Sequence, residues 1–293
     1  MEKKVDLSIK LIIYCALTVG TDTGDDTLYK CSGIGAECAL LFAKASAKLA
    51  LVGRNVGNLM KVANSCKDFT SEPLVIAADL CVQDDVEQIV NKTLAHFGRL
   101  DVLVNNAGIM VLRSIEAGID AFEEVVRTNL WGPFRLTDLA MPHLIQAKGN
   151  VVNISSMLSS MPVSMMTAYC MSKAAVDMFT KCAAVEFGPK GVRVNAVNPG
   201  PVKTALMKNA GLNEEADDLF YSTLESASPL GKVACGKDVA EVVLFLAKGE
   251  AGTGAYLPKD ENSIPYEAKP APLKLQTMGL SEILSRSIEH TKM

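Results

Sequence analysis

The chain has few aromatic residues, no Cys-x-x-Cys pair and no apolar run long enough to cross a membrane. Aromatic residues make up 5% of its 293 residues, with a single tryptophan. A membrane-spanning helix needs about 18 or more apolar residues, and no segment approaches this length. We therefore expect no membrane span and, since no cysteine pair has the spacing of a metal motif, no metal site.

A strong charge of either sign is also lacking. The formal net charge is −4, charged residues make up 21% and hydrophobic residues 49%. These values are typical of a globular protein and argue against a disordered or nucleic-acid-binding chain. The eight scattered cysteines, several of them within apolar runs, indicate reduced thiols. We therefore expect a cytoplasmic protein.

The apolar run Leu11 to Val19 has more than one interpretation. Lys3 and Lys4 precede it, as in a signal peptide, but Glu2 and Asp6 interrupt the basic region and no clear cleavage site follows. A membrane anchor would require the run to leave the sheet. We favour a buried strand.

Short apolar runs alternate with helical patterns along most of the chain. The runs are Leu11 to Val19, Leu49 to Val52, Leu74 to Ala77, Val102 to Val104, Val151 to Ile154 and Val192 to Val197. The helical segments are Gly35 to Lys48, Asp84 to His96, Asp120 to Gln146, Ala168 to Phe187 and Lys237 to Leu246. This alternation predicts a single α/β domain built on a doubly wound, Rossmann-type parallel sheet.

Candidate ligand-binding residues follow the predicted strands. Gly33-Ile34-Gly35 opens a helix, where backbone N–H groups can hold a pyrophosphate; close helix packing is the alternative. Asp79-Leu80 can present a carboxylate to an adenine amino group, or Asp79 can cap the next helix. Asn105-Asn106-Ala107-Gly108 suits ligand contact or a turn.

The residues that point to chemistry are Ser155-Ser156, after a strand, and Tyr169 with Lys173 on the next helix. Positions i and i+4 share one helical face, so the ammonium can lower the pKa of the phenol and make it an acid/base group. A serine hydroxyl can polarise a substrate carbonyl. The alternative is an exposed i,i+4 pair, which is common on helices.

In this order the motifs resemble those of the short-chain dehydrogenase/reductase family, over residues 9 to 262. The resemblance rests on Gly33-Ile34-Gly35, Asp79-Leu80, Asn105 to Gly108, Asn129, Asn153 to Ser156, Tyr169 with Lys173, and Asn198-Pro199-Gly200. It implies an oxidoreductase that interconverts a ketone or aldehyde and an alcohol by hydride transfer with a nicotinamide cofactor. Tyr169 would be the acid/base, Ser156 would polarise the substrate, and Lys173 would also hold the nicotinamide ribose.

Two further segments gain roles from the resemblance. Asn129 would hold a water in a proton relay behind Lys173; otherwise it is a polar residue inside a helix. The loop Pro199-Gly200-Pro201-Val202-Lys203-Thr204 would meet the nicotinamide carboxamide, with Val202 through its backbone and Thr204 through its hydroxyl; otherwise it is a turn. The resemblance also implies a homotetramer or homodimer built through the helices around 120–146 and 168–187.

The cofactor end departs from the family pattern. The second strand ends in Gly53-Arg54-Asn55 without an acidic residue for a ribose 2′-hydroxyl, so Arg54 favours NADP(H), with NAD(H) possible. Gly24, the first glycine of the motif, is separated from Gly33 by residues 25–32, including Asp25 and Asp26. This insertion leaves a second interpretation open: a catalytically weak pseudoenzyme or scaffold.

The substrate cannot be named from the residues. Methionines 157, 161, 165, 166 and 207 predict an adaptable, apolar pocket for a small-molecule carbonyl or alcohol. Gly254 to Leu257 would form a closing strand, and residues 263–293 are a C-terminal extension to which we assign no role.

Overall fold

A six-stranded parallel sheet organises the protein. A computed structural model describes residues 11–15, 33–248 and 252–253. The strands are β1 (Leu11–Cys15), β2 (Lys48–Gly53), β3 (Leu74–Ala77), β4 (Val102–Asn105), β5 (Asn150–Ile154) and β6 (Arg193–Val197). Their order is β3-β2-β1-β4-β5-β6, and every neighbouring pair is parallel. The predicted doubly wound α/β fold is confirmed.

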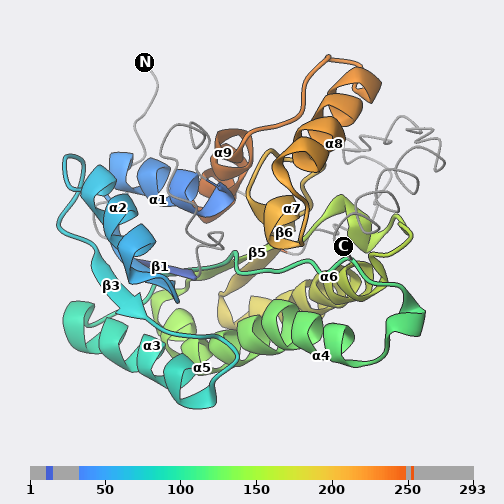
Figure 1. The fold of residues 1–293 in the computed structure, drawn as a ribbon. Coiled ribbons are helices and arrows are strands. Elements are labelled where there is room, and N and C mark those ends of the chain that lie inside the picture. Colours follow the sequence, from blue (N-terminus) through green and yellow to red (C-terminus); the bar gives the residue numbers. More distant parts are fainter. Residues whose placement is uncertain (1–10, 16–32, 249–251, 254–293) are drawn as a thin grey trace, which may run out of the picture.

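Helices cover both faces of this sheet (Figure 1). They are α1 (Ile34–Lys44), α2 (Val56–Cys66), α3 (Gln83–Phe97), α4 (Asp120–Val126), α5 (Gly132–Ala147), α6 (Thr167–Phe187), α7 (Leu206–Asn209), α8 (Glu214–Ala227) and α9 (Gly236–Ala247). Short helical turns are η1 (Ile115–Ala117), η2 (Arg127–Trp131), η3 (Met157–Ser159) and η4 (Gly188–Lys190). Within the described part of the chain, no helix has both the length and the apolar character needed to cross a bilayer.

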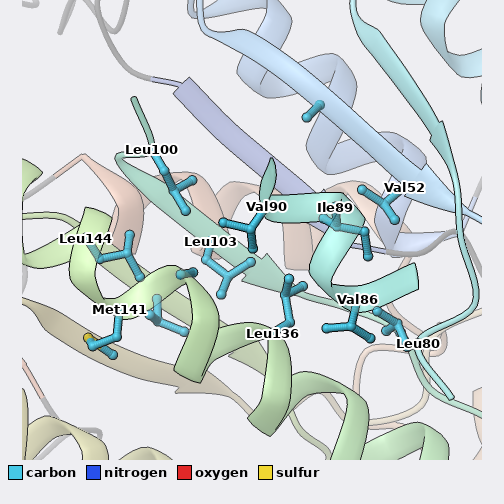
Figure 2. Packing of buried hydrophobic residues seen from close by; sticks show 14 of the residues in the cluster. Val52, Leu80, Val86, Ile89, Val90, Leu100, Leu103, Leu136, Met141 and Leu144 are labelled. Carbon is cyan, nitrogen blue, oxygen red and sulfur yellow. The ribbon is translucent and has the colours of Figure 1, made fainter. Parts of the chain in front are cut away.

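The strands are apolar on both sides because each face of the sheet is packed. Along β2, Leu49 and Leu51 join the core under α1, α2 and α9, whereas Ala50 and Val52 join the core over α3, α5 and α6. Alternate side chains of a strand point to opposite faces, which explains this division. Figure 2 shows the second core, where Leu103 of β4 lies among side chains from α3 and α5.

The predicted helix over residues 120–146 is interrupted. The π-helical turn η2 separates α4 from α5. Pro133 at the start of α5 has no N–H to donate to the preceding turn. Gly132 lies against Leu80, whose Cβ would be 2.8 Å from a Cβ built on the glycine. The buried positions continue with a helical spacing on both sides of η2. The sequence periodicity alone could therefore not show this interruption.

One other helix boundary differs from the prediction, and several predicted segments lie outside the described residues. The first helical segment is shorter than expected, since α1 ends at Lys44 and Lys48 already belongs to β2. Ser46 turns the chain between them with φ of 62°. Gly24, residues 16–19, the closing strand expected at 254–257 and the extension 263–293 lie outside the described residues, as do both predicted domain boundaries.

Candidate active site

A cleft opens at the carboxyl ends of the strands, where doubly wound sheets bind ligands. Its empty volume, counting the part open to solvent, is about 740 Å³. The lining residues are Gly33, Ile34, Gly35, Asn106, Gly108, Ile154, Ser155, Ser156, Tyr169, Lys173, Pro199, Gly200, Val202, Thr204 and Leu206. Most of the residues singled out in the sequence therefore meet in one place, although they come from distant parts of the chain.

Tyr169 and Lys173 lie one turn apart on α6 and are both buried, with 6% and 3% of their surfaces exposed. Lys173 Nζ donates a hydrogen bond of 2.8 Å to the carbonyl oxygen of Ile154, at the end of β5. It lies 5.6 Å from the centre of the Tyr169 ring. The alternative interpretation, an exposed i,i+4 pair, is therefore wrong.

Burial controls the protonation of this pair. It raises the pKa of Tyr169 to about 12, against a smaller lowering effect of the hydrogen bond with Ser156. It also lowers the pKa of Lys173 to about 8, although Asp177 acts in the opposite direction. The expected lowering of the Tyr169 pKa by Lys173 is not found, because desolvation disfavours both charged forms. In this arrangement the phenol is protonated at neutral pH.

The two adjacent serines after β5 have different surroundings. Ser155 Oγ donates to the carbonyl oxygen of Lys173 at 3.2 Å, so its hydroxyl is engaged by α6. Ser156 Oγ accepts from Leu158 N at 3.1 Å and caps η3. That bond leaves the Ser156 proton available, and the hydroxyl also interacts with the Tyr169 phenol. This geometry favours Ser156 over Ser155 as the group that contacts a substrate oxygen.

Asn129 lies behind Lys173, in the π-helical turn η2, and is almost fully buried. Its Oδ1 accepts from Ile109 N at 2.8 Å, and its Nδ2 donates to Ile109 O at 2.9 Å and to Ser172 Oγ at 3.0 Å. Asn129 therefore ties the strand-end loop after β4 to α6. Ser172, which the sequence reading did not single out, lies between Tyr169 and Lys173 and completes this link.

The phosphate end of the cleft is formed by backbone. Gly33 precedes α1 without a side-chain cap, and Gly33, Ile34 and Gly35 line the cleft. A helix N-terminus of this kind offers N–H groups and a positive dipole end to an anion. Across the cleft, a Cβ on Gly108 would lie 3.3 Å from Lys173 Nζ. These features fit the diphosphate and nicotinamide ribose of a dinucleotide.

The predicted adenine end lies outside the lining of this cleft. Arg54 Nη1 and Asp79 Oδ2 are 3.8 Å apart, with side-chain exposures of 70% and 35%. Asp79 Oδ1 accepts from Cys81 N at 2.9 Å, whereas α3 begins after Val82, so the alternative role of Asp79 as a helix cap is wrong. Leu80 and Ala107 have their side chains in the second core, which leaves only their backbones for a ligand.

Some motif residues hold the sheet together instead of facing the cleft. Asn105 Nδ2 donates to Asn153 Oδ1 at 2.8 Å and to Thr137 Oγ1 at 3.0 Å. Asn153 Nδ2 donates to Thr180 Oγ1 at 2.9 Å. This buried network links β4 and β5 to α5 and α6. It holds in register the two strand ends that carry the cleft residues.

An apolar pocket adjoins the cleft and shares Ser156 and Tyr169 with it. Its lining consists of Met110, Ser156, Met157, Leu158, Val163, Met166, Tyr169, Gly200, Pro201, Val202, Thr204, Leu206, Met207, Phe220, Tyr221 and Leu224. Met157, Met166 and Met207 lie where the methionine pattern predicts them, whereas Met161 and Met165 are not in the lining. Tyr221 also lines the pocket; it falls within the segment Ala205 to Leu230, which the sequence predicts for the pocket wall, although no motif singles it out.

Comparison with known proteins places this geometry in a family. A family model described as enoyl-(acyl carrier protein) reductase matches residues 29–260. An 11-beta-hydroxysteroid dehydrogenase A from Sesamum indicum is 37% identical over 202 residues, which cover 66% of this chain and 58% of the relative's length. An uncharacterised oxidoreductase from Thermotoga maritima is 34% identical, with 79% of this chain and 93% of the relative covered.

The fold has solved counterparts as well. The crystal structure of a short-chain dehydrogenase/reductase of unknown function from Caenorhabditis elegans, with cofactor, superposes with a TM-score of 0.74. It is 30% identical and covers 83% of this chain and 89% of its own. In sequence alone, a 3-oxoacyl-[acyl-carrier-protein] reductase from Thermotoga maritima is also similar: it is 34% identical, with 75% of this chain and 88% of the relative covered.

Proposed function

Because the chain belongs to the short-chain dehydrogenase/reductase family of NAD(P)-dependent oxidoreductases, we propose that it reduces an apolar, uncharged ketone or aldehyde with NADPH. One observation carries the proposal: Ser156 and Tyr169 lie where the apolar pocket meets the cleft of α1. A carbonyl held there has a proton donor, a polarising hydroxyl and an anion-binding helix end within one site.

The side chains divide the work by their surroundings. Ser156 donates to the carbonyl oxygen and places it beside the Tyr169 phenol, which gives up its proton as negative charge develops on that oxygen. Since burial keeps Tyr169 protonated at neutral pH, the resting state is the form that reduction consumes. The bound nicotinamide supplies the hydride to the carbonyl carbon.

Lys173 and Asn129 support this step from behind. Lys173 would hold the nicotinamide ribose and favour the phenolate that forms when Tyr169 loses its proton. Asn129 fixes the loop and the helix on either side of Lys173 through Ile109 and Ser172. We propose that Asn129 also orients a water that returns a proton to Lys173.

NADP(H) is the proposed cofactor. Gly33, Ile34, Gly35 and the loop 199–204 would hold the diphosphate and nicotinamide, and Arg54 would meet the 2′-phosphate. Arg54 is largely exposed and its nearest carboxylate, Asp79, is 3.8 Å away, so the guanidinium keeps donors for an incoming phosphate. Titration with NADPH and NADH, followed by fluorescence, tests this: tighter binding of NADH would overturn the preference.

The substrate proposal rests on the lining of the pocket. Among the described residues that line it, none is charged, and Met110, Met166, Phe220 and Leu224 contribute large apolar side chains. Burying a charged or many-hydroxyl substrate there would leave its polar groups unpaired. We expect kcat/KM to rise along a series of ketones of growing apolar size. A higher value for a free sugar or a carboxylated ketone would contradict the proposal.

A catalytically weak member of the family is the alternative that the interrupted glycine motif favours. Residues 25–32 bring two carboxylates, Asp25 and Asp26, into the segment of the sequence before Gly33. Negative charge close to a phosphate site would oppose the binding of an anion. The NADPH titration separates the two possibilities, because a ligand that binds the native state also raises the thermal midpoint. A protein that bound neither nucleotide would not be a reductase.

We also propose a homodimer or homotetramer, in a compartment that keeps thiols reduced. Phe134 of α5 and Met178 and Val185 of α6 are large apolar residues with more than half of their surface exposed. Apolar side chains gathered on neighbouring helices are typical of subunit interfaces. Light scattering tests this: a monomer at micromolar concentration would contradict it. Within the described residues, cysteines 38, 66, 81, 170, 182 and 235 form no disulfide.

A further inference from the structure

Tyr221 joins the helix that covers the apolar pocket to the loop at the nicotinamide end of the cleft. It lies in the middle of α8 and is 3% exposed. Its ring lines the apolar pocket beside Phe220, with the two ring centres 5.2 Å apart. Its hydroxyl, however, makes its hydrogen bonds to the backbone of residues 202–204.

The contacts of this hydroxyl are all with loop backbone. Tyr221 Oη lies 3.0 Å from the carbonyl oxygen of Val202 and 3.3 Å from that of Thr204, and it accepts from Thr204 N at 3.2 Å. A phenol has one proton, so it donates to one carbonyl at a time. The shorter distance makes Val202 the main acceptor.

The loop that Tyr221 holds is also part of the cleft. Val202 and Thr204 line both the cleft and the apolar pocket. Val202 pairs with Ala234 as an isolated bridge on its other side. The backbone of this loop is therefore held on two sides, by Ala234 and by Tyr221. Of these two attachments, the one from Tyr221 comes from α8, the helix that covers the pocket.

We propose that Tyr221 is a positioning residue for the nicotinamide end of the cofactor, and that it couples α8 to the loop 202–204. This inference rests on the proposed function, since it assumes that the loop meets the nicotinamide. Tyr221 is not a second acid/base group. Its hydroxyl is engaged by the backbone of the loop, and burial raises the pKa of its phenol, so it stays a donor to the loop.

The test compares Tyr221→Phe with the wild type for two ligands of one cleft: NADPH, and 2′-phospho-ADP-ribose, which lacks the nicotinamide. Removing the hydroxyl leaves Thr204 N–H and Val202 C=O without this partner, so the loop loses its set position. We expect the Kd of NADPH to rise about tenfold, as for the loss of one buried hydrogen bond. We expect the Kd of 2′-phospho-ADP-ribose to stay unchanged, which also shows that the variant is folded.

Two further variants sharpen the result. Ser222→Ala removes a neighbouring hydroxyl of α8 that donates to Leu219 O of its own helix, at 3.0 Å, and should change neither Kd. Tyr221→Leu removes the ring as well, and should add a rise in KM for the ketone to the loss of NADPH affinity.

The outcomes separate this inference from the proposed function. Unchanged NADPH affinity in Tyr221→Phe, or equal loss of both ligands, would overturn the positioning role while the reductase assignment stood. If the wild type prefers NADH, the same comparison with NADH and ADP-ribose applies. A wild type that bound no nucleotide would overturn both.

Discussion

The two ends of the cleft are built in different ways. At the catalytic end, Lys173 and Asn129 are buried and make hydrogen bonds of 2.8 to 3.0 Å to neighbouring elements. At the adenine end, Arg54 is exposed and its pairing distance with Asp79 is 3.8 Å. Buried, bonded groups keep one geometry, whereas exposed ion pairs are weakly held and screened by salt. The proposed catalytic end is therefore preformed, whereas the proposed adenine end carries an exposed, weakly held ion pair.

The largest expected effect lies at the catalytic end. Tyr169→Phe removes only the phenolic proton donor, so we expect kcat to fall by about 10²- to 10⁴-fold, with little change in the Kd of NADPH. Steady-state kinetics and a fluorescence titration measure the two quantities. If turnover persisted at wild-type level, Tyr169 would not be the acid/base group.

Asn129→Ala tests whether the catalytic end is preformed by its hydrogen bonds. The substitution leaves the partly buried N–H and C=O of Ile109 without their partner, which should cost about 2 to 4 kcal/mol of unfolding free energy. Denaturant unfolding measures the cost, and kcat should fall as well. Ser172→Ala is the matched control: it keeps both bonds to Ile109 and should cost less. Equal costs would show that the Asn129–Ile109 pair is not the main support.

Arg54→Ala tests the opposite end. Loss of one exposed, charge-assisted contact should raise the Kd of NADPH about tenfold and leave the Kd of NADH unchanged, because only NADPH carries the 2′-phosphate. The NADPH effect should shrink at high salt. Arg135→Ala, which removes an arginine paired with Glu87 and Asp138 on α3 and α5, is the control. Loss of NADH affinity in Arg54→Ala would contradict the assignment.

The last expected effect is a pH dependence of stability. In the folded protein the pKa of Lys173 is lowered from 10.5 to about 8, so above pH 8 the unfolded chain binds more protons and stability rises with pH. We expect the unfolding free energy of the wild type, relative to Lys173→Met, to increase between pH 8 and 10. Tyr169 has the opposite sign but only above pH 10, since its pKa is raised from 10.0 to about 12. A flat difference would show that Lys173 is not desolvated.

Much of the fold was predictable because local patterns repeat along the chain. The alternation of apolar runs and helical segments gives the parallel sheet, and each strand is apolar on both sides because both faces are packed. The end of α1 and the break at η2 were not predictable. The first depends on a turn at Ser46 and the second on the contact of Gly132 with Leu80, which is a tertiary contact.

The candidate site divides in the same way. Motif order alone brought Ser156, Tyr169 and Lys173 together as a hypothesis, and their placement in one cleft agrees with it. Motif order could not distinguish residues that face the cleft from residues that hold the sheet together, such as Asn105 and Asn153. It also gave the wrong direction for the pKa of Tyr169, because burial is not visible in a spacing.

The sequence by itself determined the sheet, its doubly wound order and the candidate reactive side chains, since periodicity and spacing are local properties. Only the tertiary structure showed why the hydroxyl of Ser156 is available whereas that of Ser155 is engaged, and how α8 reaches the loop 202–204. Tyr221 illustrates the reason. Its partners, Val202 and Thr204, lie 19 and 17 residues away along the chain, and no local pattern records a hydrogen bond made only after folding.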